Sequence, residues 1–203
     1  EQANTLEKEL TRLSQEFNGF NNQLNTNWKK LQQNLNANEA AIEFVNFKYF
    51  NKRQYFGVKY CALVLLPGSE FPFMVDLFNE SDLQNILDKA VGSDLQIVNK
   101  LYGINSNLNA SFYNLIWKPL ESLLANVETI YISSSGVLHK IAFAALTDSH
   151  GKFLSETFNL NILNTTGIIE NKKDEFTISK KTTAAIFGGI QYNTNTTQQI
   201  IWN

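Results

Sequence analysis

The sequence predicts an α/β fold in which a layered sheet carries flanking helices. Segments with the spacing of strands alternate along the chain with segments that have the spacing of helices. The run QYFGVKYCALVLLPG is β-branched, aromatic and apolar on both faces, which is typical of a covered central strand. No internal repeat of fixed period interrupts this alternation, so the pattern does not indicate a solenoid.

The chain is expected to begin with helices. Apolar residues recur every three or four positions, first from Leu6 and again from Leu24, and a polar run around Gly19 separates the two patterns. We therefore predict a helical segment over residues 1–45, either a hairpin or the end of a TPR-like array. The α/β domain would then occupy residues 46–203.

The strands and helices of the second region occur in a definite order. FPFMVDLF is predicted to return as the hairpin partner of the central strand, and SDLQNILDKAV to form a helix capped by Ser81. ASFYNLIWKPLESLLANV reads as a second helix, which Pro119 either kinks or divides. ETIYISS, GVLHKIAFAAL, FNLNILNTT and TTAAIFGGI are predicted to be extended. The apolar face of the second helix is expected to pack in the core: Phe112, Leu115, Ile116, Leu120, Leu123 and Leu124.

Charge and composition argue against several broad classes of function. The 203 residues carry a net charge of -2, which provides no general attraction to nucleic acid or to anionic membranes. Short basic pairs such as Lys52-Arg53, Lys172-Lys173 and Lys180-Lys181 are scattered and typical of solvated faces. The start EQANTLEKEL does not resemble a signal peptide, and the longest apolar run is too short to span a bilayer. We expect neither a nucleic-acid nor a membrane partner.

Cysteine usage points to the cytoplasm. Cys61 is the one cysteine, so no internal disulfide can form, which favours a reducing compartment. The chain is rich in asparagine, and we attribute its Asn-x-Ser/Thr patterns to chance. These patterns begin at Asn79, Asn109, Asn164 and Asn195.

A Ser-His-Asp triad would have to draw on Ser133–Ser135, His139 or His150, and Asp148. A nucleophilic serine needs a sharp turn that exposes its oxygen and a base within hydrogen-bond reach. SSSGV lacks the Gly-x-Ser-x-Gly context, and serines before a glycine such as Gly136 are typical of turns. We therefore assign no catalytic role to these residues.

The sequence also does not support a cysteine nucleophile, a metal site or a phosphate-binding or dinucleotide-binding loop. Cys61 lies in the middle of a predicted strand, which indicates a buried, inert thiol rather than a nucleophile. The two histidines and one cysteine do not have the spacing of metal ligands. FGGI at Phe187–Ile190 lacks the lysine of a phosphate loop and the third glycine of a dinucleotide loop. The sequence thus predicts no catalytic, cofactor-binding or metal-binding residue and no cofactor.

The order in which these sequence patterns follow one another along the chain is more informative than the composition. YCALVLLPGSEFPFMVDL, then FYNLIWKPLESLLANVETIYISSSGVLHKIAFAALTD, then FLSETFNLNILNTTGII and AAIFGGIQY resemble the front part of the CHAT domain, over residues 28–192. This family consists of caspase-like peptidase domains that often follow TPR repeats. Ala142 stands where the family usually has proline. The family's turn after the third strand is matched at Gly136, Leu138, His139, Ile141, Phe143, Ala145 and Leu146.

The resemblance implies a caspase-like layered sheet and a cysteine endopeptidase. In that family a histidine and a cysteine form the dyad, and both follow the strand that AAIFGGIQY resembles. No cysteine follows Cys61, and His150-Gly151 lies before that strand, so the dyad is expected downstream of this chain. His139 would be a structural histidine. We expect its segment to be extended and its ring to be partly buried on one face with Val137, Ile141 and Phe143.

Two hypotheses remain open. In the first, the chain is the scaffold-forming, amino-terminal part of a CHAT peptidase, and its partners are the downstream half of the domain and a protein substrate or regulator. In the second, it is a noncatalytic protein-interaction module or a pseudo-peptidase attached to helical repeats. The residues that come after Asn203 in the parent gene distinguish the two.

Overall fold

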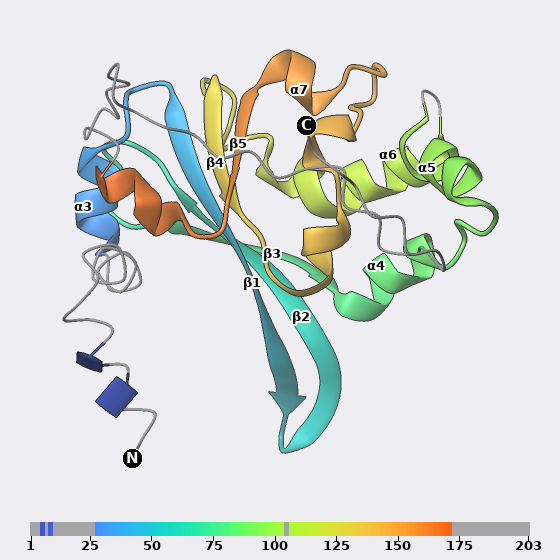
Figure 1. The fold of residues 1–203 in the computed structure, drawn as a ribbon, viewed down its shortest axis with the longest axis horizontal. Helices are drawn as coiled ribbons and strands as arrows, with labels where there is room; N and C mark the ends of the chain where they lie inside the picture. The colour runs from blue at the N-terminus through green and yellow to red at the C-terminus, as the bar shows by residue number, and fades with distance from the viewer. Residues whose placement is uncertain (1–4, 7, 10–26, 104–105, 172–203) are drawn as a thin grey trace, which may run out of the picture. The chain divides into compact units, whose positions relative to one another are not determined.

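The computed structural model describes residues 5–6, 8–9, 27–103 and 106–171 (Figure 1). Internal contacts divide the chain into residues 1–173 and 174–203, and the second unit lies outside the described residues. The predicted strand TTAAIFGGI and the FGGI turn fall there too. All described helices and strands therefore belong to the first unit.

A five-stranded mixed sheet forms the centre of this unit, in the order β3-β2-β1-β4-β5. The β1–β2 and β2–β3 pairs are antiparallel, whereas β4 is parallel to both β1 and β5. The predicted hairpin of FPFMVDLF and the extended pieces ETIYISS and FNLNILNTT are confirmed as β3, β4 and β5. The strands are β1 (Glu39–Asn51), β2 (Gln54–Leu65), β3 (Phe73–Asn79), β4 (Thr129–Ser133) and β5 (Asn159–Leu163).

One face of the sheet carries the main core. Ile42, Val64 and Ile132 are fully buried there because direct strand partners share a face and helices cover it. The helices on this side pack Leu83, Phe112 and Trp117 against the sheet. They are α4 (Glu80–Leu87), α5 (Asp94–Tyr102), α6 (Asn107–Phe112), the π-turn η1 (Tyr113–Trp117) and the 3-10 turn η2 (Lys118–Leu120).

A smaller core covers one end of the opposite face. There α3 (Trp28–Gln33) and η5 (Thr166–Asn171) lie over the sheet, and they contact each other. Leu31 and Leu35 pack against Ala41 and Leu65. Helical elements thus flank the sheet on both faces, so the predicted α/β fold with flanking helices is confirmed.

One helix boundary differs from prediction. α4 begins after Asn79 rather than after Ser81, and the backbone N–H of Asn79 donates to the carboxylate of Asp82 at 3.0 Å.

The predicted helix around Pro119 is divided there, which is one of the two predicted alternatives. The π-turn η1 ends at Trp117, and the 3-10 turn η2 begins at Lys118 with Pro119 in its first turn. A proline has no N–H with which to continue the α-helical ladder.

The segment GVLHKIAFAAL is not a strand, so that prediction was wrong. It forms two 3-10 turns, η3 (Gly136–Lys140) and η4 (Phe143–Ala145), and α7 (Leu154–Thr157) comes next. Gly136 adopts a φ of 56°, which turns the chain away from the direction of β4.

β1 begins at Glu39, so the helical region ends before that residue rather than near residue 45. Of the predicted amino-terminal helices, residues 5, 6, 8 and 9 are helical, and α3 starts at Trp28. The remainder of residues 1–26 lies outside the described residues.

Candidate functional site

The three consecutive serines have three different environments. The Ser133 hydroxyl is buried at the end of β4 and donates to the carbonyl of Asn164 at 3.1 Å. Ser134 Oγ lies 3.1 Å from His139 Nδ1. The Ser135 Oγ is buried and has no hydrogen-bond partner among the described residues. Of these three serines, only Ser134 contacts an imidazole among the described residues, and a second serine–imidazole contact joins Ser149 Oγ to His150 Nδ1 at 3.5 Å. Both contacts are exposed.

The aspartate of the rejected triad engages the other histidine. Asp148 Oδ2 lies 3.7 Å from His150 Nδ1, while its Oδ1 accepts hydrogen bonds from the backbone N–H groups of His150 and Lys152. Burial opposes ionisation of Asp148, but these hydrogen bonds outweigh it and lower its pKa. The Asp148 carboxylate thus binds backbone N–H groups of its own loop. No described contact joins it to His139.

His139 itself is exposed, so the expectation of a partly buried ring was wrong. The 3-10 turn η3 places Leu138 in the core instead, and His139 and Lys140 face solvent. The ring makes the single described contact with Ser134. Among the described residues, no carboxylate orients this imidazole, and no thiol forms a hydrogen bond with it.

Cys61 is buried, as predicted. It lies on β2 opposite Val45 on one side and Asp76 on the other. Burial raises the pKa of its thiol, the Asp76 carboxylate raises it further, and Lys59 opposes both. A thiol with a raised pKa is a poor nucleophile at neutral pH.

Asn109 has a structural role, and its Asn-x-Ser pattern is inaccessible to glycosylation in the folded chain. Its side chain is fully buried, donates to the carbonyl of Ala145 and accepts from the N–H of Thr147. These bonds tie α6 to the end of η4. Within the described residues, no three His, Cys, Asp or Glu side chains gather as a metal site would require.

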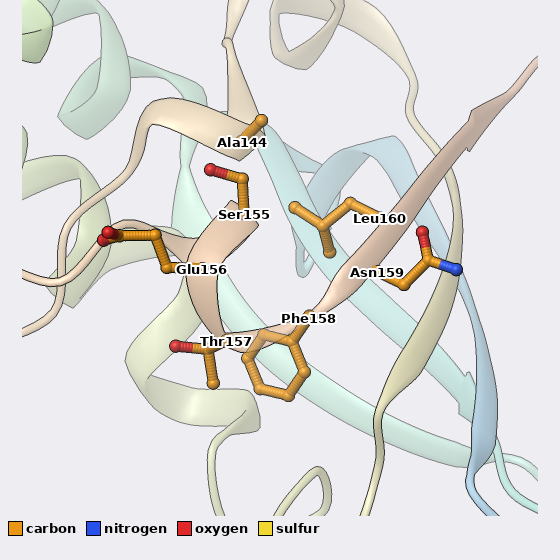
Figure 2. Close-up of a pocket in the computed structure, with 7 residues that line it drawn as sticks. All are labelled: Ala144, Ser155, Glu156, Thr157, Phe158, Asn159 and Leu160. Atoms are coloured by element: carbon orange, nitrogen blue, oxygen red, sulfur yellow. The ribbon is translucent and has the colours of Figure 1, made fainter.

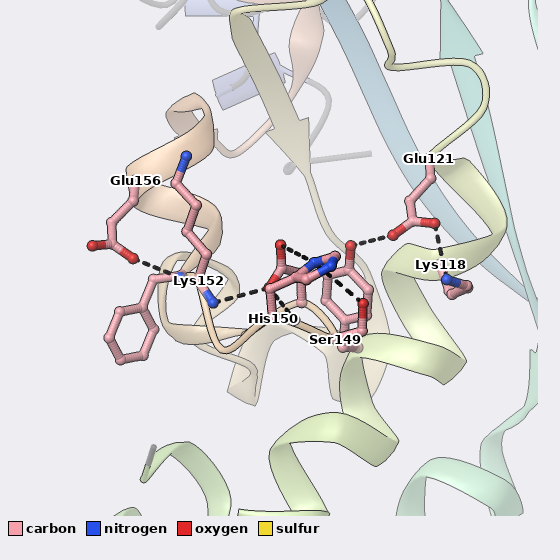
Figure 3. A network of polar contacts seen from close by, with 9 residues as sticks. Lys118, Glu121, Ser149, His150, Lys152 and Glu156 are labelled. Atoms are coloured by element: carbon pink, nitrogen blue, oxygen red, sulfur yellow. Dashed lines mark hydrogen bonds and ion pairs between the residues drawn. The ribbon is translucent and has the colours of Figure 1, made fainter. Parts of the chain in front are cut away.

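Figure 3 shows a network of polar contacts that includes Lys118 and Glu121. Part of this network borders a cavity of about 270 Å³ that Trp117 and Phe158 also line. The buried Tyr113 hydroxyl donates to Glu121 Oε1, and Lys118 Nζ lies 3.2 Å from Glu121 Oε2. Asp148 lines the same cavity.

Tyr113 and Glu121 shift each other's pKa. The hydrogen bond from Tyr113 lowers the pKa of Glu121, burial opposes this, and Lys118 lowers it further. Burial raises the pKa of Tyr113, and Glu121 raises it further. Both shifts lead away from neutral pH, whereas a general acid or base works best with a pKa near the working pH.

A second cavity of about 510 Å³ lies along α7 and the start of β5 (Figure 2). Its lining comes from Ala144 and from residues 155–160, and Thr157 and Phe158 line both cavities. α7 is therefore a short wall between two hollows at the β5 edge of the sheet.

The sequence analysis missed the Tyr113–Glu121 pair. Both residues belong to the helix that was interpreted only as a core face, and a buried tyrosine needs a polar partner for its hydroxyl. Lys118 and Glu121, three residues apart, provide a visible signal of a charged cluster on that helix.

No helix in the described part of the chain combines the length and apolar character needed to cross a bilayer. Comparison of the chain with protein-family models, with curated proteins and with solved structures gave no match.

Proposed function

We propose that this chain is the amino-terminal, scaffold-forming part of a caspase-like cysteine endopeptidase domain of the CHAT type. The catalytic histidine and cysteine would be supplied by polypeptide downstream of Asn203. In this proposal the described sheet positions the catalytic half and contributes no reacting group.

The exposed apolar edge of the sheet at β5 supports this function best. Ile162 is the direct parallel partner of Ile132, so the two side chains share the face that carries the main core. Ile132 is fully buried, yet Ile162 is 56% exposed. No strand in the described ranges pairs with the outer edge of β5. An apolar edge of this kind fits the addition of further strands and their covering helices.

The turn after β4 also supports a scaffold role. Leu138, Ile141, Phe143 and Leu146 are buried in the main core, so the apolar positions of the family-like motif serve packing. The neighbouring histidine is exposed and has no acidic partner among the described residues. This is the behaviour expected of a structural turn, not of a catalytic one.

The alternative is a noncatalytic interaction module or pseudo-peptidase. A specific observation favours it: part of the sheet face opposite the main core carries exposed apolar side chains. Leu63 on β2 and Met74 on β3 are direct partners there, and Phe47 lies further along β1. A protein partner could cover such a surface.

The deciding experiment joins the chain to the polypeptide encoded after Asn203 and measures peptidase activity on a mixed peptide library. Alone, the chain should have no activity. The combined protein should cleave peptides and lose cleavage when the first cysteine of the downstream part is replaced by alanine. A stop codon directly after Asn203, or an inactive combined protein, would favour the interaction module.

A pair of variants tests the role of the β5 edge in the combined protein. Ile162→Asp should lower activity by more than about tenfold, because an unpaired carboxylate would be buried where the two parts meet. Leu95→Asp is the matched control, since Leu95 is an exposed leucine on α5. Equal activity of the two variants would contradict assembly at this edge.

A further inference from the structure

The outer half of the β1–β2 hairpin, residues 46–58, is a two-stranded ribbon that we term the hairpin arm. β4 pairs with β1 only at Glu39–Glu43, and β3 pairs with β2 only at Lys59–Val64. The arm therefore continues past both neighbouring strands (Figure 1). An isolated two-stranded ribbon is marginally stable in water. Because the arm adds little to the stability of the fold, we expect its side chains to serve a function.

Large aromatic side chains cover both faces of the arm. Along β1, alternation places the consecutive residues Tyr49 and Phe50 on opposite faces. The register shifts between them, so Phe56 is an extra residue on β2 with no direct partner on β1. Tyr49 packs against Phe56 with ring centroids 6.1 Å apart, and Phe50 packs against Tyr55 at 5.4 Å. Each aromatic of the arm remains between 40 and 54% exposed: Phe47, Tyr49, Phe50, Tyr55 and Phe56.

The same segment is purely basic. Residues 44–60, which are the arm and two residues on either side of it, contain no aspartate or glutamate, although the whole chain has a net charge of -2. Their basic residues are Lys48, Lys52, Arg53 and Lys59. Lys59 pairs with Asp76 at 2.6 Å. The other three have no ion-pair partner among the described residues.

The two basic residues at the turn of the arm have an unfavourable backbone conformation. Lys52 and Arg53 have φ values of 45° and 72°, in the left-handed region that hairpin turns usually fill with Asn-Gly. Strained backbone of this kind concentrates at functional positions. The basic side chains are thus present where an unstrained pair of residues would serve the fold better.

We propose that the hairpin arm binds the interface of an anionic lipid bilayer. Exposed aromatic rings would enter the headgroup region, while Lys48, Lys52 and Arg53 contact anionic headgroups. A membrane interface surrounds the tip, which suits rings on both faces. A protein docked on one face would leave the other rings in water.

The ring geometry argues against single-stranded nucleic acid. Successive bases stack on a row of ring faces along one groove. Here the rings of each pair are tilted by 52° or 53° to each other, and the two pairs lie on opposite faces of the ribbon. The arm presents no continuous stacking surface.

Flotation of the full chain with vesicles tests the proposal. We expect it to float with phosphatidylcholine vesicles that contain about one part in three phosphatidylserine, and not with phosphatidylcholine alone. Added salt should weaken binding because it screens the cations. Lys52→Gln with Arg53→Gln should lower the partition coefficient about 25-fold, at about fivefold for each basic residue.

Two matched pairs of variants distinguish binding through the hairpin arm from nonspecific adsorption of exposed apolar side chains. Phe50→Ser with Phe56→Ser should abolish flotation, whereas Met74→Ser with Leu95→Ser should not, although Met74 is 72% exposed. Circular dichroism should show that all variants are folded. Equal loss of flotation in both pairs of variants would overturn the proposal. So does binding to an oligonucleotide without flotation, or an arm that mediates self-association instead.

Discussion

The hydroxyl of Tyr60 accepts a hydrogen bond from the backbone N–H of Val137 at 2.9 Å, across 77 positions of sequence. The same hydroxyl donates to Glu80 Oε2 at 2.9 Å. One side chain from β2 therefore fixes both the start of α4 and the turn η3 after β4. The turn η3 is therefore tied to strand β2 by this hydrogen bond.

Gly136→Ala should destabilise the fold by about 2 kcal/mol or more. The φ of 56° alone costs a non-glycine residue about 1–2 kcal/mol. An added Cβ would also lie 2.2 Å from the Tyr60 hydroxyl oxygen, closer than real contacts allow. Urea unfolding followed by circular dichroism measures the change.

Gly151→Ala is the control for this prediction. Its φ of 77° is similarly left-handed, but an added Cβ would meet nothing within 4 Å. It should cost only the conformational part, about 1 kcal/mol. Adding Tyr60→Phe should relieve part of the Gly136→Ala clash and give a non-additive double variant. Equal effects of the two glycine substitutions would refute the close approach.

Tyr60→Phe should reduce stability at neutral pH by about 1–3 kcal/mol, because it leaves the Val137 N–H without its partner. Tyr55→Phe, on the exposed arm, should change little.

The effect of Tyr60→Phe should shrink in alkaline solution. Burial raises the pKa of Tyr60 to about 12, and Glu80 adds to the increase while the Val137 N–H opposes it. An unfolded tyrosine titrates near about 10. Between these values the native state keeps a proton that the unfolded chain releases, so this contribution is present below about pH 10 and lost as pH rises toward 12. Unfolding free energies of the parent and Tyr60→Phe, measured up to about pH 11.5, check this. A constant difference would contradict it.

Apolar patterning predicted most of the sheet. β2, β3, β4 and β5 each arise from short apolar runs bounded by turn residues, and such runs depend mainly on local sequence. GVLHKIAFAAL failed because its apolar residues fit two periods. Val137, Ile141 and Phe143 have the even spacing of one strand face. Leu138 and Ile141 are three apart, as are Phe143 and Leu146, which suits 3-10 turns.

The rest of the architecture depends on long-range contacts. α5 was not predicted, although Leu95, Val98 and Leu101 have the three-residue spacing of a helix. Of these three, only Leu101 is buried in the structure. The Tyr60–Val137 link requires that β2 and η3 meet in space. The basic hairpin arm was missed because net charge averages over the chain and hides a segment without acids.

Native Cys61 should react with a disulfide reagent at least about a hundredfold more slowly than in urea. It is 7% exposed and has a raised pKa, so modification requires local opening. The matched control is Leu63→Cys in a Cys61→Ala background, on the same strand and the same face but exposed. Similar slow rates for both thiols would mean that exposure does not govern their reactivity.

His139→Ala should leave both stability and peptidase turnover of the combined protein nearly unchanged, within about 0.5 kcal/mol of unfolding free energy. The ring is exposed on η3 and touches only Ser134 among the described residues. Leu138→Ala, one residue earlier, should cost about 2–5 kcal/mol because that side chain is fully buried in the main core. Thermal unfolding and turnover per folded molecule distinguish the two variants. If His139→Ala removed activity while Leu138→Ala removed only stability, the turn would be catalytic, and the scaffold role proposed for it would be wrong.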